Sequence, residues 1–477
     1  MAVYRKKNDS VFEEQIEIIA RDLLLLAEEN KSQIEIFFLR AVTEKMKGGG
    51  HARISGEHIE DAGLSIRVLK RGRIGTAATS LPAGQDLINS IFKEAIGNIE
   101  VRRAKRFELE QFSAYGVDLG EHDHFLYNKD ILRISEDDLI DLTAQLASVA
   151  YMVPDGQSIA SEVSKTVEYV RVINSNGCNK SSMIGWLEGK INLSVERHTS
   201  LAVSFAEECS RNELKVHQIG ADSLRSAEMY LQKHQLTNED LNVKTGEKLP
   251  LIWSSNALSD LLAFTLVPAL RSRKLLRVDH PFLATPNQEI APGFVNIYDD
   301  PLRHYGIGSA AFDDAGNTLD RWDLIKAGVQ EHFISDLGRQ SVFRKSYFER
   351  ISRSYRHSLN IFPTNLIIKL DQNYLVNNII EHCPRGLYIK SIVGGHGSNI
   401  ITGDFSIGLS EAYLIRNGVL EGPVNGEMNS NIFTLLRGTC LGSKTHHEEK
   451  PLNAPYGIVL PEMLIECPTK EIRIQLQ

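Results

Sequence analysis

The stretch from Gly394 to Gly408 reads Gly-Gly-His-Gly-Ser-Asn-Ile-Ile-Thr-Gly-Asp-Phe-Ser-Ile-Gly and is the most informative part of the chain. Its glycines are too dense for a helix or an ordinary strand. Glycine is needed at this density where the backbone takes positive φ or lies close against another group. The admixture of Asp, Ser and Thr is typical of a loop that lines a site. We therefore predict that this loop borders the functional site.

The segments after the loop predict a β-rich C-terminal part. Asn417-Gly418 stands between two apolar segments, Ala412 to Arg416 and Val419 to Val424, and is a strong signal for a type I′ hairpin. We predict a short helix over Met428 to Leu436 and a final strand over Tyr456 to Ile465.

The segments before the loop contain a boundary and an apolar helix. The polar stretch Leu236 to Glu247 is typical of a lobe boundary, and Lys248 to Trp253 predicts a strand that leads into a helix over Ala257 to Leu270. This helix is the most apolar helix-length run, but it is too short to span a bilayer and suits a buried position.

The N-terminal half alternates between helical and strand patterns. A capping box at Ser10 and Glu13 opens the first predicted helix. The predicted helices are Ser10–Glu29, Pro82–Arg106, Ser135–Tyr151 and Ser223–Gln235, and the predicted strands are Gln33–Val42, Leu64–Leu69, Ile74–Thr79, Thr166–Ile173, Ser181–Val195 and Ser200–Phe205. The prediction is an α+β fold with two lobes. An N-terminal lobe of helices and antiparallel sheet spans 1–240, with a subdivision near residue 112 left open. A β-rich lobe spans 241–477 and contains the helix over 257–270.

Composition excludes several functional classes. The 53 basic and 61 acidic residues give a formal charge of −8, which offers no attraction for nucleic acid or for an anionic membrane. The five cysteines are far apart and contain no C-x-x-C pair, so we expect reduced thiols. Met1 to Gln15 has no apolar core of a signal peptide. These features predict a cytoplasmic protein.

The histidines give weak metal signals. Neither H-E-x-x-H nor H-E-x-x-x-H occurs in the chain, although these are the helical patterns of zinc peptidases. His122 and His124 could share one face of a strand, but no third ligand can be assigned. His446 and His447 are adjacent and point apart, so we interpret His446 to Glu449 as a solvated loop.

The signals for other kinds of chemistry are equally weak. Ser406, Asp404 and His396 contain the residue types of a catalytic triad, but no G-x-S-x-G elbow is present, and loop polar groups bonded to their own backbone are the better interpretation. Cys440 is interpreted as an inert thiol. The Gly48–Gly50 run has no P-loop lysine, and the basic run Arg102–Arg106 suits a helix C-terminus. Residue chemistry alone therefore identifies no reaction.

A set of short motifs identifies a family. They are Gly63–Val68 with Arg73–Ala77, Ile173–Gly177, Asp299–Pro301, Phe312–Gly316, Pro363–Leu366, Thr402–Ser406 and Asn417–Gly418. In this order and spacing the chain resembles the TldD/PmbA family, in which PmbA is also called TldE. The resemblance covers about Ala62 to Glu466.

The resemblance implies a cytoplasmic metallopeptidase system of two homologous subunits. Its TldD type carries H-E-x-x-x-H on a helix after the domain boundary and a C-terminal cysteine ligand, and its TldE type lacks both. Here Ala263 and Phe264 stand where the TldD type has His-Glu, and Pro268 stands at the second His. None of these side chains can bind zinc. Cys440 falls too early for the missing ligand. The expectation is a metal-free chain, with zinc in a TldD-like partner.

The family resemblance also implies a narrow channel for unfolded peptides between the subunits. We expect Thr402, Gly403, Asp404, Phe405 and Ser406 to border this channel, with a peptide bound by strand addition. Two departures suggest a divergent branch: the usual Asp-Asp-Glu-Gly reads Asp-Asp-Ala-Gly at 313–316, and the segment 424–431 is altered. Two alternatives stay open, a stand-alone homodimeric peptidase that uses His122, His124 or His446, and a non-enzymatic peptide-binding scaffold.

Overall fold

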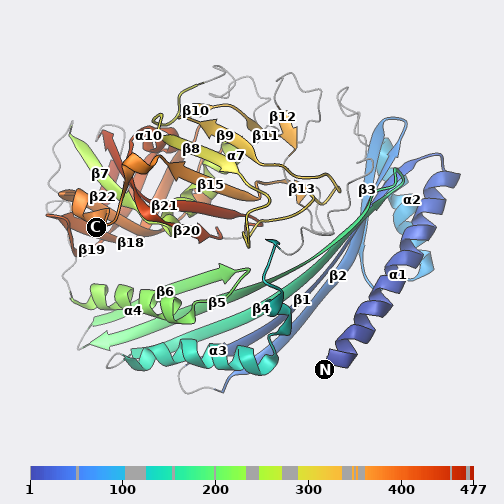
Figure 1. The fold of residues 1–477 in the computed structure, drawn as a ribbon, viewed down its shortest axis with the longest axis horizontal. Helices are drawn as coiled ribbons and strands as arrows, with labels where there is room; N and C mark the ends of the chain where they lie inside the picture. Colours follow the sequence, from blue (N-terminus) through green and yellow to red (C-terminus); the bar gives the residue numbers. More distant parts are fainter. Residues whose placement is uncertain are drawn as a thin grey trace.

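Two lobes, each built on one large sheet, make up the protein. The computed structural model describes residues 2–49, 53–101, 125–152, 156–197, 200–232, 247–270, 288–335, 346–348, 351–352, 360–451, 454–468 and 473–476. The second lobe lies over the concave side of the first sheet (Figure 1). The predicted α+β class is confirmed. No helix within these residues is long and apolar enough to cross a membrane.

The N-terminal sheet has six strands in the order β3-β2-β1-β4-β5-β6, and all its pairs are antiparallel. The strands are β1 (Gln33–Gly48), β2 (Ser55–Lys70), β3 (Arg73–Ser80), β4 (Gly156–Asn174), β5 (Asn179–Arg197) and β6 (Ser200–Ser210). Long strands with alternating apolar residues can bury one face over their whole length. β6 forms one edge of this sheet.

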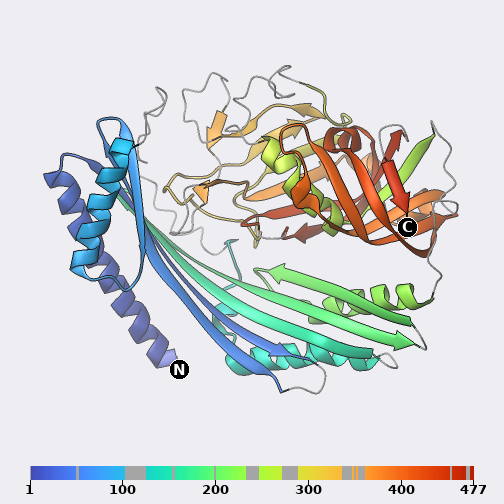
Figure 2. The same cartoon turned by 180° about the vertical axis from the view of Figure 1, so that it is seen from behind.

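Four helices cover one face of the N-terminal sheet. They are α1 (Ala2–Glu29), α2 (Gln85–Val101), α3 (Glu136–Ser148) and α4 (Val216–Gln232). Ile36 and Phe38 of β1 pack under α1 and α2 at one end of the sheet, and Leu187 and Ile191 of β5 pack under α3 and α4 at the other. Figure 2 shows α1 and α2 side by side at the end of the sheet that lies away from α4. The sheet therefore has one helix-covered face and one face that is turned toward the second lobe.

The opposite face of the N-terminal sheet packs on the second lobe. Phe37 of β1 and Val172 of β4 join a core cluster with Ala311 and Phe312, which belong to a loop of the C-terminal lobe. Lys180 donates a hydrogen bond to the Gly316 carbonyl at 2.9 Å, which adds a polar contact between the lobes at the same place. The two lobes are therefore joined by a packed interface.

The C-terminal sheet runs in the order β10-β9-β8-β15-β21-β7-β17-β18-β19-β22, and β20 pairs with β21 and with β16. Its strands are β7 (Lys248–Trp253), β8 (Val295–Asp299), β9 (Trp322–Lys326), β10 (Val329–Gln330), β15 (Asn365–Leu370), β16 (Leu375–Val376), β17 (Arg385–Val393), β18 (Asp404–Arg416), β19 (Val419–Asn431), β20 (Thr439–Glu449), β21 (Gly457–Pro468) and β22 (Arg473–Leu476). Two short pairs stand apart, β11 (Phe333–Ser335) with β12 (Ser346–Phe348) and β13 (Ile351–Ser352) with β14 (Asn360–Ile361).

Three short helices fill one side of the C-terminal sheet. They are α6 (Ser255–Phe264), α7 (Leu266–Leu270) and α10 (Ile432–Arg437). Their apolar side chains, such as Leu261 and Leu435, form the largest core cluster with Leu251, Leu387 and Ile407 of the strands. A second cluster around Ile252 and Ile415 covers the opposite side. The central strands of this sheet are thus buried on both faces, as the apolar composition of β7 and β21 requires.

Most predicted elements are present, with shifted ends. The helix predicted from Ser10 begins at Ala2, the helix predicted from Ser223 begins at Val216, and the helix predicted over Met428–Leu436 is α10, which begins at Ile432. The Asn417-Gly418 turn is confirmed, with φ of 52° and 72° at the two residues. The subdivision near residue 112 and most of the boundary at 236–247 lie outside the described residues.

Candidate functional site

The apolar helix predicted over 257–270 is two helices, so that prediction was wrong in detail. α6 ends at Phe264 and α7 begins at Leu266, with Thr265 between them. Pro268 has no N–H to donate to the Phe264 carbonyl, which interrupts the helical hydrogen bonds at this point. Thr265 Oγ1 instead donates to the Leu261 carbonyl at 2.5 Å. The break therefore lies within the segment predicted to correspond to the metal motif.

The motif positions are less buried than most of this helix pair. Most residues of α6 and α7 are buried, whereas Ala263, Phe264 and Pro268 are only partly buried. None carries a donor atom for a metal. Among the residues that the structure describes, no three His, Cys, Asp or Glu side chains lie together in a way that could hold an ion. The residues at this place do not fit a zinc ion.

Phe264 contacts the glycine-rich loop. A Cβ atom on Gly395 would lie 2.6 Å from Phe264 Cδ2, so the ring occupies the space that a side chain at 395 would need. Gly394, just before it, has φ of +85°, a conformation that favours glycine. The loop predicted to border the site and the helix that carries the altered motif are therefore in direct contact.

The segment Thr402–Ser406 divides into an inner and an outer set. Phe405 is 4% exposed and belongs to the main core, and a Cβ atom on Gly403 would lie 2.8 Å from Ile432 Cγ2. These two residues face the core, so the structure gives them no surface for a peptide. Asp404 and Ser406 are exposed and Thr402 is partly buried, so only these three can face a channel.

Hydrogen bonds within the loop fix the Asp404 carboxylate. Thr402 Oγ1 donates to Asp404 Oδ2 at 2.6 Å, and Asn431 Nδ2 donates to Asp404 Oδ1 at 2.8 Å. Asn431 also donates to the Thr402 carbonyl at 2.8 Å. Both carboxylate oxygens thus have partners that are not His396. The interpretation of Ser406, Asp404 and His396 as loop polar groups rather than a triad agrees with this arrangement.

The segment His446–Glu449 is not a solvated loop, and that interpretation was wrong. It belongs to β20 and pairs with residues 458–461 of β21. His446 is exposed, but Glu448 and Glu449 are partly buried where the two lobes meet. Glu448 Oε1 accepts a hydrogen bond from the Ile307 amide at 2.7 Å, and Glu449 Oε1 accepts one from Ser255 Oγ at 2.6 Å. The pairing with β21 and the lobe contact are long-range effects that the local polarity of the segment does not reveal.

Two other family motifs lie at either end of the loop that contacts the N-terminal sheet. The Asp299 carboxylate accepts hydrogen bonds from the Thr364 amide at 2.8 Å and from its hydroxyl at 2.9 Å. Burial raises the pKa of Asp299 to about 7, against the effect of these bonds. Asp313 holds the tight turn before Gly316 by accepting from the Ala315 and Asn317 amides. The loop between these motifs carries the residues that touch the N-terminal sheet.

Arg211 contacts the second lobe, a role that the sequence did not predict. Its side chain is buried, and Nη1 donates to the Ser309 carbonyl of the second lobe at 2.6 Å. A lone arginine after a strand carries no signal for such a role. His122 and His124 lie outside the described residues, so the structure does not place them.

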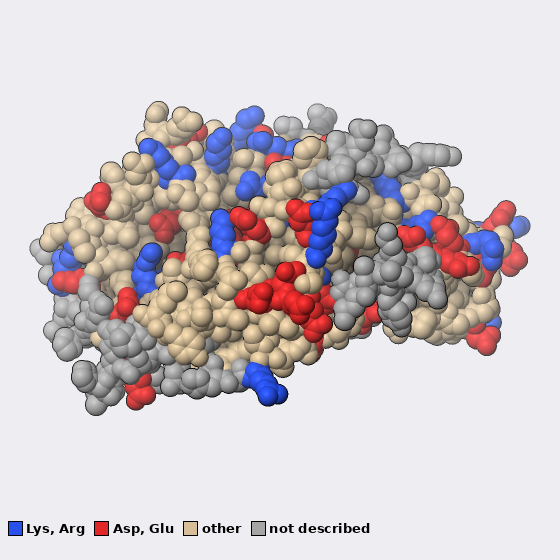
Figure 3. All heavy atoms as spheres, turned by 60° about the horizontal axis from the view of Figure 1, so that its bottom comes forward, with Lys and Arg blue, Asp and Glu red and all other residues tan. Residues whose placement is uncertain are grey.

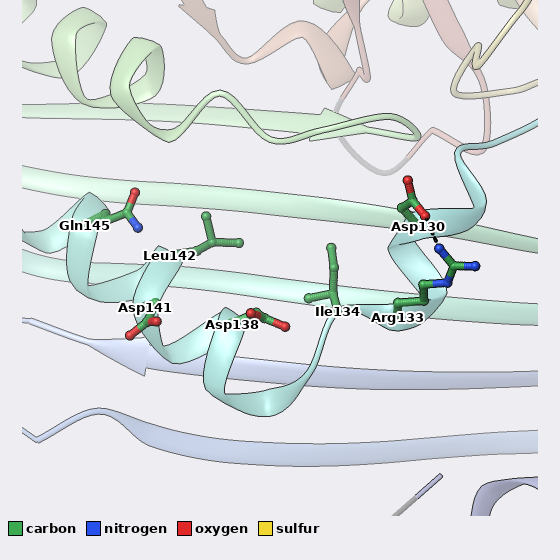
Figure 4. Close-up of a pocket in the computed structure, with 7 residues that line it drawn as sticks. All are labelled: Asp130, Arg133, Ile134, Asp138, Asp141, Leu142 and Gln145. Atoms are coloured by element: carbon green, nitrogen blue, oxygen red, sulfur yellow. Dashed lines mark hydrogen bonds and ion pairs between the residues drawn. The ribbon is translucent and has the colours of Figure 1, made fainter.

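A surface hollow of about 430 Å³ lies along α3 and is lined by Asp130, Arg133, Ile134, Asp138, Asp141, Leu142 and Gln145 (Figure 4). Figure 3 brings the lower side of the Figure 1 view forward and shows acidic side chains gathered near the middle of that side. The first turn of α3 carries Glu136, Asp137 and Asp138, and the Ser135–Asp138 capping box is complete. None of the predicted site residues that the structure describes lines this hollow, so we do not assign it to the candidate site.

Comparison with known proteins finds one matching family model and several related proteins. Residues 245–469 match the family model described as the PmbA/TldA metallopeptidase C-terminal domain. An uncharacterised protein of Methanocaldococcus jannaschii is 25% identical over 417 residues, which are 87% of this chain and 92% of that protein. Metalloprotease PmbA of Escherichia coli O157:H7 is 24% identical over 209 residues, which are 43% of this chain and 41% of that protein.

Solved structures share the fold at low identity. TldE from Thermococcus kodakarensis has a TM-score of 0.77 at 18% identity, and the match covers 94% of this chain and 99% of that one. A Thermotoga maritima structure has the same TM-score at 19% identity and covers 97% of this chain and 100% of that one. The likeness therefore extends over both lobes.

Proposed function

Because the chain belongs to the PmbA/TldD family through residues 245–469, we propose that it is a TldE-like subunit with no metal of its own. It pairs with a metal-bearing TldD-like chain, and the complex processes or degrades unfolded or modified peptides. The observation that carries this proposal is the replacement of all three motif side chains by Ala263, Phe264 and Pro268, none of which has a donor atom.

In this proposal the hydrolytic chemistry belongs to the partner, and this chain supplies peptide-binding surface. The Phe264 ring against Gly395 closes the place where the TldD type holds its catalytic residues. The outward side chains Thr402, Asp404 and Ser406 lie beside this place, on a loop held in one shape by Asn431. A fixed loop binds an extended peptide at a lower entropic cost than a mobile loop does.

The test is zinc content and peptidase activity of the chain alone and with a partner that carries H-E-x-x-x-H. We expect the two chains to co-purify, and we expect zinc and chelator-sensitive peptide hydrolysis only in the complex. A partner in which the motif glutamate is replaced by glutamine serves as the control and should assemble without activity. Stoichiometric zinc in the lone chain would overturn the proposal, as would chelator-sensitive hydrolysis by it, and the stand-alone peptidase would then be favoured.

A second prediction tests the peptide surface. In the active complex, Ser406→Arg should raise KM about fivefold, which corresponds to about 1 kcal/mol of lost binding, and leave zinc content unchanged. Val419→Arg is the matched control, because Val419 is 63% exposed at the opposite end of the β18–β19 hairpin. Equal KM values for the two variants would exclude the surface around Ser406 from peptide binding.

A further inference from the structure

Lys390 is an extra residue in the pairing of β17 with β18. The register of the two strands shifts between Ile389 and Ser391, and Lys390 is left out of it. A bulge of this kind bends the strand and changes the direction of a side chain. Lys390 Nζ donates a hydrogen bond to the hydroxyl of Ser226 in α4. A strand of the C-terminal lobe is thereby bonded to a helix of the N-terminal lobe.

A carboxylate holds the Lys390 ammonium beside α4. Lys390 Nζ lies 3.0 Å from Glu411 Oε1 of β18, and the two side chains are only 29% and 12% exposed. The Tyr413 hydroxyl donates to the same carboxylate oxygen at 2.7 Å. Ser226 is 2% exposed, so its bond with Lys390 is largely shielded from water. A hydrogen bond from a charged donor is stronger in such a place than in water.

The backbone at Lys390 is bonded to the helix predicted to carry the altered motif. The Lys390 carbonyl accepts a hydrogen bond from Ser254 Oγ at 2.8 Å, and the Ile389 carbonyl accepts one from the Ser254 amide at 3.0 Å. Ser254 is the N-cap of α6, and its Oγ atom accepts from the Ala257 amide at 3.1 Å. Lys390 therefore contacts α4 through its side chain and the start of α6 through its backbone.

Both C-terminal elements that meet at Lys390 lead to the candidate site. β17 ends at Val393 and continues into Gly394 and Gly395 of the glycine-rich loop. α6 ends at Phe264, whose ring occupies the space that a side chain at Gly395 would need. Lys390 therefore lies where the N-terminal lobe, α6 and the strand before the glycine-rich loop are joined.

We infer that Lys390 is a positioning residue, which fixes the glycine-rich loop and α6 relative to the N-terminal lobe through its bond with Ser226. Without this bond the bulge of β17 is held only from within the C-terminal lobe, and the glycine-rich loop opens more often. The inference rests on the proposed function only for its effect on peptide binding, because opening of the loop can be measured on the chain alone.

The experiment is amide hydrogen exchange on the full chain. The reporting amides are those of Gly397 and Ser398 in the glycine-rich loop and Leu258 in α6, which all donate to backbone carbonyls. Ser226→Ala is the decisive variant, because it lies in the other lobe and leaves the ion pair of Lys390 intact. Alanine suits a helix interior better than serine does, so α4 itself should not be destabilised. We expect exchange at the reporting amides to increase about fivefold in Ser226→Ala and about tenfold in Lys390→Met.

Three further variants serve as controls. Lys326→Met should exchange as wild type, because Lys326 is 60% exposed and its carboxylate partner, Asp323 at 3.9 Å, lies on the same strand. Lys390→Arg should keep most of the protection, since a guanidinium can donate to both Glu411 and Ser226. The double variant Ser226→Ala/Lys390→Met should match Lys390→Met, because both changes remove the same bond between the lobes.

Peptide kinetics test the consequence for the proposed function. In the active complex, Ser226→Ala should raise KM about threefold and leave kcat and zinc content unchanged, since a more mobile loop costs more entropy to order. If no partner gives activity but the exchange differences are found, the proposed function fails and the role of Lys390 stands. Unchanged exchange at the reporting amides in Ser226→Ala overturns the inference, whether or not the complex is active.

Discussion

Replacing Gly308 with alanine is expected to lower the free energy of unfolding by about 3 kcal/mol, because the new methyl group has no room. A Cβ atom at 308 would lie 2.5 Å from the Thr364 carbonyl carbon and closer still to its oxygen. Thr364 is buried directly before β15, and its backbone atoms cannot move aside as the end of a flexible side chain can. The Gly308 amide also donates to Asn365 Oδ1 at 2.9 Å, so any shift of the loop breaks this bond.

The measurement is the midpoint of urea unfolding for wild type, Gly308→Ala and the control Gly97→Ala. Gly97 lies in α2, and a Cβ atom there would meet nothing within 4 Å. Alanine in a helix interior is favoured over glycine by about 0.5–1 kcal/mol, so this control should be slightly more stable than wild type. If the two variants shift the midpoint in the same direction by similar amounts, the close contact of Gly308 with Thr364 is refuted.

Local patterns predicted the strands and their turns well. The predicted strands Leu64–Leu69 and Ile74–Thr79 lie in the β2–β3 hairpin, in which Lys70 faces Arg73 and Gly72 has φ of +74°. Such turns depend on which residues accept positive φ, and that preference is a property of the residues themselves. Hairpins could therefore be predicted without knowledge of the rest of the chain.

The broken helix shows a limit of periodicity. The apolar pattern over Ala257–Leu270 is continuous, because both α6 and α7 bury most of their surface in the same core. Pro268 carried the signal for the break, since proline removes a hydrogen bond one turn before its own position. The apolar pattern indicates where a helix is buried, whereas proline decides whether it is continuous.

The candidate site could be predicted only in part. The glycine-rich loop and the helix predicted to carry the altered motif lie in contact through Gly395 and Phe264. The orientation of Gly403 and Phe405 was not predictable, because it depends on how α10 packs against the loop. Partial burial of Glu448 and Glu449 depends on strand pairing and on a second lobe, which local composition does not contain.

Arg211→Met is expected to destabilise the protein by about 2–3 kcal/mol, because it removes a charged donor from the lobe interface without emptying the space. The guanidinium donates to the Ser309 carbonyl at 2.6 Å and reaches the Leu126 carbonyl at 3.5 Å. Methionine fills similar volume but cannot donate, so the Ser309 carbonyl loses its charged partner at a buried position. The weakened contact is the one between the end of β6 and the loop that carries Ser309.

Arg133→Met is the matched control for this effect. Arg133 donates to Asp130 Oδ1 at 2.8 Å, a good ion-pair distance, but its side chain is 84% exposed. Exposed pairs contribute about 0–1 kcal/mol, since water solvates both partners after the pair is broken. Urea unfolding should therefore show a larger loss of stability for Arg211→Met than for Arg133→Met, although the two arginines make hydrogen bonds of similar length. Hydrogen exchange in β6 should rise only in Arg211→Met. Similar losses of stability in both variants would mean that burial at the lobe interface does not determine how strongly the Arg211 hydrogen bond stabilises the protein.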